Sequence, residues 1–200
     1  MLGMIKRTIS YKNERIMLSL YKTLVRPLLE YCTPVWSPHY IKDKQLLERI
    51  QHRFTRLVPG FRVMAYEDRL RRLGLWTLEE RRNRADLIEV FKMYKGVSGL
   101  PLQSMFQLTG CGRTRGHCLK LVKHRNRLDL RKYFFSERVI NRWNALNDDT
   151  VLSGSVNGFK RQLAKIRDVK KGFFMPWTSS PPSLKASSGW IYLSWCGRTR

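Results

Sequence analysis

The sequence predicts a mainly α-helical protein, a small helical bundle that carries a β-hairpin or an extended arm around residues 117–131 and ends in a disordered tail. Three observations lead to this prediction. Apolar residues recur at helical spacing through 1–96, glycine and proline interrupt any period in 97–116, and serines, prolines and aperiodic apolar residues fill 169–200. We therefore expect a helical region, a loop, a C-terminal extension over 117–168 and a tail, in that order.

The first helix is expected to begin after Asn13, whose side chain suits the N-cap position. Pro27 lacks the amide hydrogen that a helix interior needs, so we expect it to kink or end this helix. Apolar residues spaced four apart define the face that should be buried, which comprises Ile16, Leu20, Leu24 and, beyond the proline, Leu28.

A second helix is expected from Asp43 until Pro59 and Gly60, a pair that stops helices. Its apolar face comprises Leu46, Leu47, Ile50, Phe54 and Leu57. Its polar face comprises Arg49, His52, Arg53 and Arg56. This pattern is typical of an amphipathic helix with one cationic side.

Two further helices complete the region 1–96. A short one is expected over 66–73, with Gly74 as its end. Thr77 and Glu80 then form an S/T-x-x-E capping box, which marks the start of a longer helix that Gly96 closes. The buried stripe of this helix should comprise Leu87, Ile88, Phe91 and Tyr94.

The extension over 117–168 is expected to hold the arm and two helices. Its apolar residues alternate in part with polar ones, at Leu119 and Leu121 and again at Leu128 and Leu130, which favours two short strands or an extended arm. The first helix should bury Val139, Ile140, Trp143 and Leu146. The second should begin at Ser155 and bury Phe159, Leu163 and Ile166.

The charge balance indicates a polyanionic partner. The chain has 39 lysines and arginines against 15 acidic residues, a formal net charge of +24. Nucleic acid is the usual partner of such an excess, although a ribosome-like protein or a region whose acidic partner domain is missing has the same composition. Scattered cysteines, no secretory signal and no apolar run near the ~20 residues that cross a bilayer predict an intracellular protein, nuclear or cytoplasmic, with no membrane partner.

Two groups of cations are candidates for contact with phosphates. The larger group surrounds the arm and consists of Arg113, Arg115, Lys120, Lys123, Arg125, Arg127, Arg131 and Lys132. The second group is the helical stripe of Arg49, Arg53 and Arg56. A merely solvated polar face is the alternative for both. The aromatic run Tyr133, Phe134 and Phe135 either stacks on bases or packs in the core.

No catalytic or metal-binding residue is predicted. Asp148 and Asp149 are the only adjacent aspartates, and they stand at an expected helix boundary without flanking strands, as ordinary first-turn carboxylates do. Four zinc-capable residues occur near the arm, at Cys111, His117, Cys118 and His124. Their spacing, C-x5-H-C-x5-H, fits neither a paired C-x2-C knuckle nor a zinc finger.

Three ordered blocks of sequence carry a family resemblance. The first comprises LYKTLVRP at 20–27, LEY at 29–31, Trp36 and LLER at 46–49. The second comprises YEDRL at 66–70, LGL at 73–75 and LEERR at 78–82. The third comprises RGH at 115–117, RLD at 127–129, RKYFFS at 131–136 and NRWNAL at 141–146. Together they resemble the region that follows the palm in reverse transcriptases of jockey-like non-LTR retrotransposons, up to about Ile166.

The resemblance implies a supporting role in polymerisation. In that family this region is similar to a polymerase thumb plus a C-terminal extension, so 1–96 is expected to be thumb-like and to hold a template–primer duplex of RNA or DNA without sequence preference. The family supplies two metal-binding carboxylates from an aromatic-Ala-Asp-Asp hairpin, and this sequence contains no such tetrapeptide.

We accordingly expect a C-terminal fragment of an RNA-directed DNA polymerase, not an enzyme by itself and without a cofactor of its own. The parent enzyme would use Mg ions in its palm. The palm domain is therefore expected as a partner of this chain, in addition to RNA or DNA. Two alternatives remain open on the residues alone: a relic open reading frame with no function, and a repurposed module that binds a protein in a groove between its helices.

Overall fold

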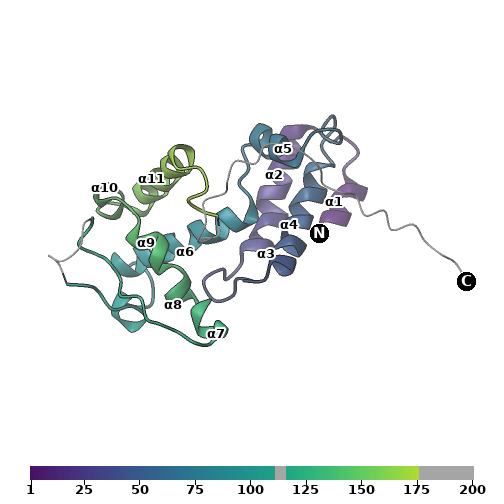
Figure 1. The fold of residues 1–200 in the computed structure, drawn as a ribbon. Helices are drawn as coiled ribbons and strands as arrows, with labels where there is room; N and C mark the ends of the chain where they lie inside the picture. The colour runs from purple at the N-terminus through teal and green to yellow at the C-terminus, as the bar shows by residue number, and fades with distance from the viewer. Residues whose placement is uncertain (111–115, 176–200) are drawn as a thin grey trace, which may run out of the picture.

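The structure is a computed structural model that describes residues 1–110 and 116–175. It is mainly helical, as predicted, and Figure 1 shows its helices gathered at the two ends of α6 (Leu78–Tyr94). The first lobe consists of α1 (Leu2–Thr8), α2 (Glu14–Leu20), the π-helix η1 (Tyr21–Val25), α3 (Arg26–Glu30), α4 (Ile41–Thr55) and α5 (Tyr66–Leu73). The second lobe consists of the 3-10 turn η2 (Leu102–Ser104), α7 (Asp129–Lys132), α8 (Phe135–Arg138), α9 (Ile140–Asn144), α10 (Asp148–Val151) and α11 (Val156–Val169).

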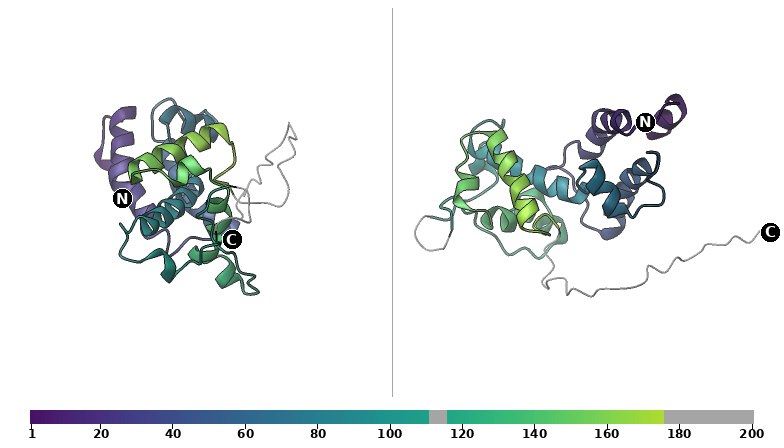
Figure 2. Two further views of the ribbon diagram at one scale, coloured as in Figure 1. Left: turned by 90° about the vertical axis from the view of Figure 1, so that its left-hand side faces the viewer. Right: turned by 90° about the horizontal axis from the view of Figure 1, so that it is seen from above.

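Helix α6 lines two separate hydrophobic cores, and Figure 2 shows it running from one lobe into the other. Leu78, at its first turn, is buried in the first core with Met17, Phe54 and Phe61. Leu87 and Phe91 belong to the second core, which is built mainly by Phe135, Val139, Ile140, Trp143, Phe159 and Leu163. Among the described residues no helix is both long enough and apolar enough to cross a bilayer.

The buried face of the first long helix differs from the predicted one by a single residue step. Met17, Tyr21, Val25 and Leu29 are buried, whereas the predicted Ile16, Leu24 and Leu28 are 44%, 37% and 62% exposed. The sequence contains two parallel stripes at spacing four, and spacing alone does not select one of them. The selected stripe is the one that includes Tyr21, whose ring stacks on Phe54 at 4.2 Å between centroids.

Of the two effects expected of Pro27, a kink or an end, the helical run does not end there. The π-helical turn η1 lets the amide of Arg26 donate to the carbonyl of Tyr21, five residues earlier, and α3 then starts a new register with Pro27 in its first turn. A first-turn amide has no intrahelical acceptor, so the missing hydrogen of proline costs nothing there.

Helix α4 (Ile41–Thr55) begins before the predicted Asp43 and ends before Pro59 and Gly60, whereas three other helix boundaries follow the sequence signals. Asn13 caps α2 by accepting the amide of Arg15, and Gly74 ends α5 with a φ of 60°, a conformation that glycine adopts without strain. Thr77 and Glu80 form the predicted capping box at the start of α6. These signals are local, which is why they can be read without knowledge of the tertiary structure.

A buried polar network fills the space between α4, α5 and η1. Gln51 is fully buried; its Oε1 accepts the hydroxyl of Tyr21 at 2.5 Å and its amide donates to the carbonyl of Trp76 at 2.9 Å. Glu48 accepts the hydroxyl of Tyr66 and, at 2.8 Å, the amide of Leu78. The network therefore joins α4 to the N-terminus of α6.

The arm is extended rather than a hairpin of its own. Leu121 forms a single antiparallel bridge with Leu108, supported by the amide of Thr109 donating to the carbonyl of Lys120 at 2.8 Å. The arm also ends earlier than expected, because Asp129–Lys132 forms the helical turn α7. Asp129 in its first turn and Lys132 in its last suit the helix dipole, which favours this turn over extended chain.

Two predicted segments of the C-terminal region need revision. The helix expected to carry Val139, Ile140, Trp143 and Leu146 is shorter than predicted, because α9 spans only Ile140–Asn144 and follows a separate short helix, α8, although all four residues are buried. The predicted tail starts too early: Phe174 is 1% exposed and packs against Trp76 with 5.3 Å between ring centroids. The rest of the predicted tail, 176–200, lies outside the described residues.

Ion pairs attach both lobes to α6. On the first lobe, Arg81 pairs with Glu30 and Glu79 pairs with Lys44 at 2.6 Å. On the second lobe, two further pairs join Asp86 to Arg138 at 2.8 Å and Glu80 to Arg167, whose Nε and Nη2 both lie 3.1 Å from the carboxylate. Ion pairs therefore hold both lobes to the same helix.

Candidate nucleic-acid interface

The three arginines of the predicted stripe share the exposed face of α4. Arg49, Arg53 and Arg56 are exposed, while Phe54 and Thr55 on the opposite face are fully buried. This division follows from the amphipathic pattern, since Leu47, Ile50 and Phe54 pack on the first core and leave the cations in solvent. Leu46, predicted on the same apolar face, is 52% exposed instead.

Two of these arginines line a groove whose other cations come from separate segments. The groove, called the basic groove below, has a volume of about 950 Å³ and lies between the start of α1 and the turn after α4. Its cations are Lys6, Lys12, Arg53, Arg56 and Arg62. No carboxylate of the described residues lines it. Sequence reasoning missed Lys6, Lys12 and Arg62, because no periodicity relates three segments that only the fold brings together.

Local helix electrostatics explain only part of this arrangement. Arg53 lies in the last turn of α4 and Arg56 caps it, positions where a cation stabilises the helix dipole by some tenths of a kcal/mol. The same effect does not account for Lys12 and Arg62, which lie outside α4. Glu14 lines the adjacent hollow, not the groove, and faces Arg72 at 3.8 Å. The groove therefore keeps a concentrated positive charge.

The cations of the arm divide into three sets. Lys123 and Lys132 are exposed and line a second hollow, described next; the ammonium of Lys123 donates to Asn141 at 2.9 Å. Arg125, Arg127 and Arg131 are exposed on the outside of the arm, and Lys120 is half-buried. Arg113 and Arg115 lie outside the described residues. The arm thus does not present its cations as one continuous row.

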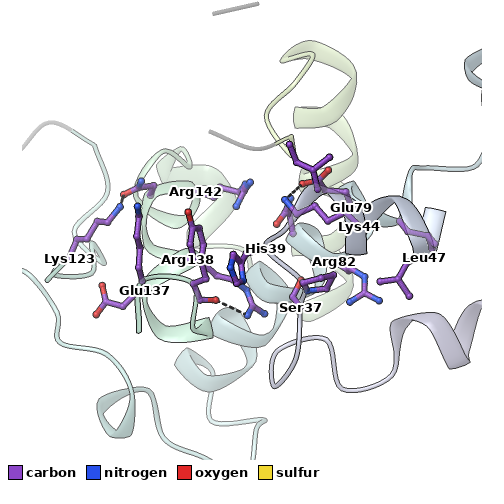
Figure 3. A pocket seen from close by; sticks show the side chains of 17 residues that line it. Ser37, His39, Lys44, Leu47, Glu79, Arg82, Lys123, Glu137, Arg138 and Arg142 are labelled. Atoms are coloured by element: carbon purple, nitrogen blue, oxygen red, sulfur yellow. Dashed lines mark hydrogen bonds and ion pairs between the residues drawn. The ribbon is translucent and has the colours of Figure 1, made fainter. Parts of the chain in front are cut away.

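The second hollow is a cleft of about 510 Å³ between the two lobes, called the central cleft below. Its floor is α6, one wall is formed by the loop before α4 and the start of α4, and the other by α7 to α9. Figure 3 shows Lys123 and Glu137 at one end, Lys44 and Arg82 at the other, and His39 between them. Six cations line it: Lys44, Arg82, Lys123, Lys132, Arg138 and Arg142.

Two arginines in the molecule are buried without an ion-pair partner among the described residues. Arg69 is 2% exposed and donates to the hydroxyl of Thr55 at 2.9 Å. Arg82 is 4% exposed, donates to the carbonyl of Leu29 at 2.5 Å and stacks over Trp36. Burial lowers the pKa of both groups, because it removes water from the charged form. Arginine nevertheless stays protonated, so both remain fixed positive charges.

The aromatic run after the arm is divided between core and surface. Phe135 is 2% exposed and belongs to the second core, whereas Phe134 is 37% exposed. Tyr133 is half-buried and stacks on His39 with 4.4 Å between ring centroids. His39 comes from the loop before α4, so this pair ties the arm to the first lobe across the central cleft.

The residues considered for metal binding do not converge. His117 is 2% exposed and its Nε2 lies 3.0 Å from the carbonyl of Trp143, while His124 is exposed beside Glu137. Cys111 lies outside the described residues. Asp148 and Asp149 occupy the first turn of α10 and are exposed. Within 1–110 and 116–175 no three histidine, cysteine or acidic side chains form a group that could hold a metal ion.

Comparisons of this chain with protein-family models, with curated proteins and with solved structures find no match.

Proposed function

We propose that this chain binds the phosphate backbone of RNA or DNA without sequence preference, as the part of a retrotransposon RNA-directed DNA polymerase that holds the template–primer duplex. The observation that carries the proposal is the basic groove, in which five cations from three segments meet with no lining carboxylate in the described structure. Lysine and arginine in such a groove bind phosphates by charge and read no bases. Nucleotide addition would be performed by a palm that carries the metal-binding aspartates.

The polymerase assignment rests on the resemblance of the three sequence blocks. The thumb-like role fits a helical lobe whose exposed cations follow one helix, α4, and continue into the groove. Release of counterions from the nucleic acid would supply most of the binding free energy.

The test is the salt dependence of binding, measured by fluorescence anisotropy with a labelled DNA duplex and an RNA–DNA hybrid of unrelated sequence. Each phosphate contact contributes about −0.9 to the slope of log K against log salt concentration. Arg53→Ala with Arg56→Ala should make the slope shallower by about 1.8, the value for two lost contacts. The double variant Arg161→Ala, Lys165→Ala removes two exposed cations from α11, in the other lobe, and should leave the slope unchanged.

Two outcomes would overturn the proposal. One is binding that does not weaken as salt rises. The other is an equal loss of slope in the α4 and α11 variants, because that would assign the effect to net charge rather than to the groove.

A protein-binding role is a second candidate, favoured by one observation. Ile16, Leu24 and Leu28 form an exposed apolar stripe along α2, η1 and α3, and Tyr31 and Val35 extend exposed apolar surface beyond it. Several large apolar side chains exposed along one helical run are typical of an interaction surface. Leu24→Asp with Leu28→Asp should abolish association with a polymerase palm in a pull-down and leave nucleic-acid binding unchanged; retained association in the variant would remove this candidate.

A further inference from the structure

The central cleft combines a size and a lining that suit a small anionic ligand. Its volume of about 510 Å³ lies within the ~300–1,000 Å³ range of small-molecule sites. Inorganic phosphate would fill only a small part of it. The lining also contains apolar groups, namely Leu47 from α4, Leu78 from α6 and the stacked rings of His39 and Tyr133.

The charge of the cleft is positive after its internal pairs are subtracted. Of the two carboxylates in the lining, Glu79 is bound to Lys44 at 2.6 Å, and Glu137 faces the ring of His124 at 3.5 Å. Arg138 is compensated by Asp86, whose side chain is buried beside the cleft. For Arg82, Arg142, Lys123 and Lys132, no carboxylate oxygen of the described residues lies within 4 Å of a charged nitrogen. Low-dielectric walls around such a group increase its attraction for an anion.

The cleft also gathers polar atoms that are buried without a hydrogen-bond partner in the described part of the chain. They are Nε2 of His39, Nε and Nη1 of Arg82, Nε of Arg142 and Oε2 of Glu137. Buried polar groups are ordinarily paired, so a concentration of exceptions around one cleft is informative. Burial lowers the pKa of Arg82 and of Arg142, because both charges are held away from water. An anion in the cleft would compensate both.

The mixture of donors and one acceptor narrows the ligand class. Arginine and lysine side chains bind phosphate oxygens, and a carboxylate such as Glu137 accepts hydrogen bonds from hydroxyl or amino groups. A ligand that offers a phosphate, hydroxyl groups and a flat apolar ring satisfies the cations, the carboxylate and the apolar groups together. A nucleotide has all three parts.

We propose that the central cleft binds a phosphorylated nucleoside, either as a free mononucleotide or as the terminal nucleotide of a strand. The binding of a terminal nucleotide rests on the proposed function, because the end of a nucleic-acid strand would then lie in the cleft while the basic groove holds the backbone of that strand. The exposed side chains of Lys123 and Lys132 contact the phosphate, and Arg82 and Arg142 add positive charge to the rest of the lining.

The experiment uses the full 200-residue chain and isothermal titration calorimetry with AMP, adenosine and inorganic phosphate. Lys123→Glu with Lys132→Glu changes two exposed side chains, so the fold should be retained, which circular dichroism verifies. The matched control is Arg125→Glu with Arg127→Glu, which reverses two exposed charges of the same arm outside the cleft lining. AMP should bind at one site and weaken at least about tenfold in the cleft variant, the factor for ~1.4 kcal/mol of lost interaction. The control variant and Arg53→Glu with Arg56→Glu in the groove should keep the affinity.

Oligonucleotides with and without a 5′ phosphate separate the two sources. A preference for the phosphorylated strand that disappears in the cleft variant assigns the cleft to strand ends; AMP binding without such a preference assigns it to free nucleotides. No AMP binding at millimolar concentration, inorganic phosphate binding as tightly as AMP, or an equal loss in the groove variant would each overturn the inference. The salt slope of duplex binding tests the groove separately, so failure of the cleft is distinguishable from failure of the proposed function.

Discussion

The pair formed by Asp86 and Arg138 should be a main attachment between the two lobes. Asp86, on α6, is 2% exposed and accepts two hydrogen bonds from Arg138, at 2.8 and 2.9 Å. Arg138, on α8, also donates to the carbonyl of Thr33 at 2.9 Å, in the segment after α3. One guanidinium therefore connects α6, α8 and the first lobe.

Asp86→Ala should destabilise the protein by about 3–5 kcal/mol, the cost of leaving a buried charge without its partner. That is a large fraction of the ~5–15 kcal/mol by which a domain is ordinarily stable. Replacing both residues, Asp86→Leu with Arg138→Met, removes the uncompensated charge as well as the pair and should recover most of the loss. The control is Asp68→Ala, which breaks an exposed pair with Arg71 at 2.7 Å and should cost less than ~1 kcal/mol.

Urea denaturation followed by tryptophan fluorescence measures these differences, because Trp143 is buried in the second core. A loss below ~1 kcal/mol for Asp86→Ala, within the range of surface pairs, would refute the reasoning. So would a double variant as unstable as Asp86→Ala alone, because the loss would then reflect packing rather than charge.

Three further predictions concern stability. Phe174→Ala should lower the free energy of unfolding by about 3–5 kcal/mol in chemical denaturation, since Phe174 is 1% exposed; a negligible loss would show that Phe174 does not contribute to the core. Thr77→Ala should lower the free energy of unfolding by ~1 kcal/mol in the same assay, because it removes the cap of α6; Thr77→Ser, which keeps a capping hydroxyl, should lower it much less. Burial raises the pKa of Glu48, so its contribution is most favourable below the unfolded-state pKa and declines as pH rises through the raised value. Glu48→Gln should therefore gain stability relative to the wild type as pH rises from the ordinary glutamate pKa of about 4.3 through the raised value, and a pH-independent difference would contradict this.

The sequence predicted those parts of the fold that local chemistry decides. The capping box at Thr77, the cap at Asn13 and the glycine at 74 each act within one helical turn, so their positions could be read directly. The choice between the stripes of Ile16 and Met17 depends on which residue meets Phe54 and Gln51, about thirty positions away. Spacing carries no information about such partners.

The candidate sites show the same limit. The arginines of α4 were predicted as one face because a helix relates them, whereas Lys6 and Arg62 join them only because the fold places α1 beside the turn after α4. In the arm, composition grouped all the cations together, but the structure places Lys123 and Lys132 in the central cleft and Arg125 outside it. The sequence shows how many cations a segment contains, whereas the fold decides which of them lie close together.

Helix α4 gives the basic groove and the central cleft a common frame. Lys44 and Leu47 near its start line the cleft, Arg53 and Arg56 at its end line the groove, and Arg49 is exposed between them. Arg56 follows Lys44 by twelve residue steps, which correspond to about 18 Å along a helix. This distance corresponds to about five steps of a nucleic-acid strand at ~3.4 Å each. Because both sites share one rigid helix, a strand that reached from one to the other would meet cations at a fixed separation, which a pair of sites on separate flexible segments would not provide.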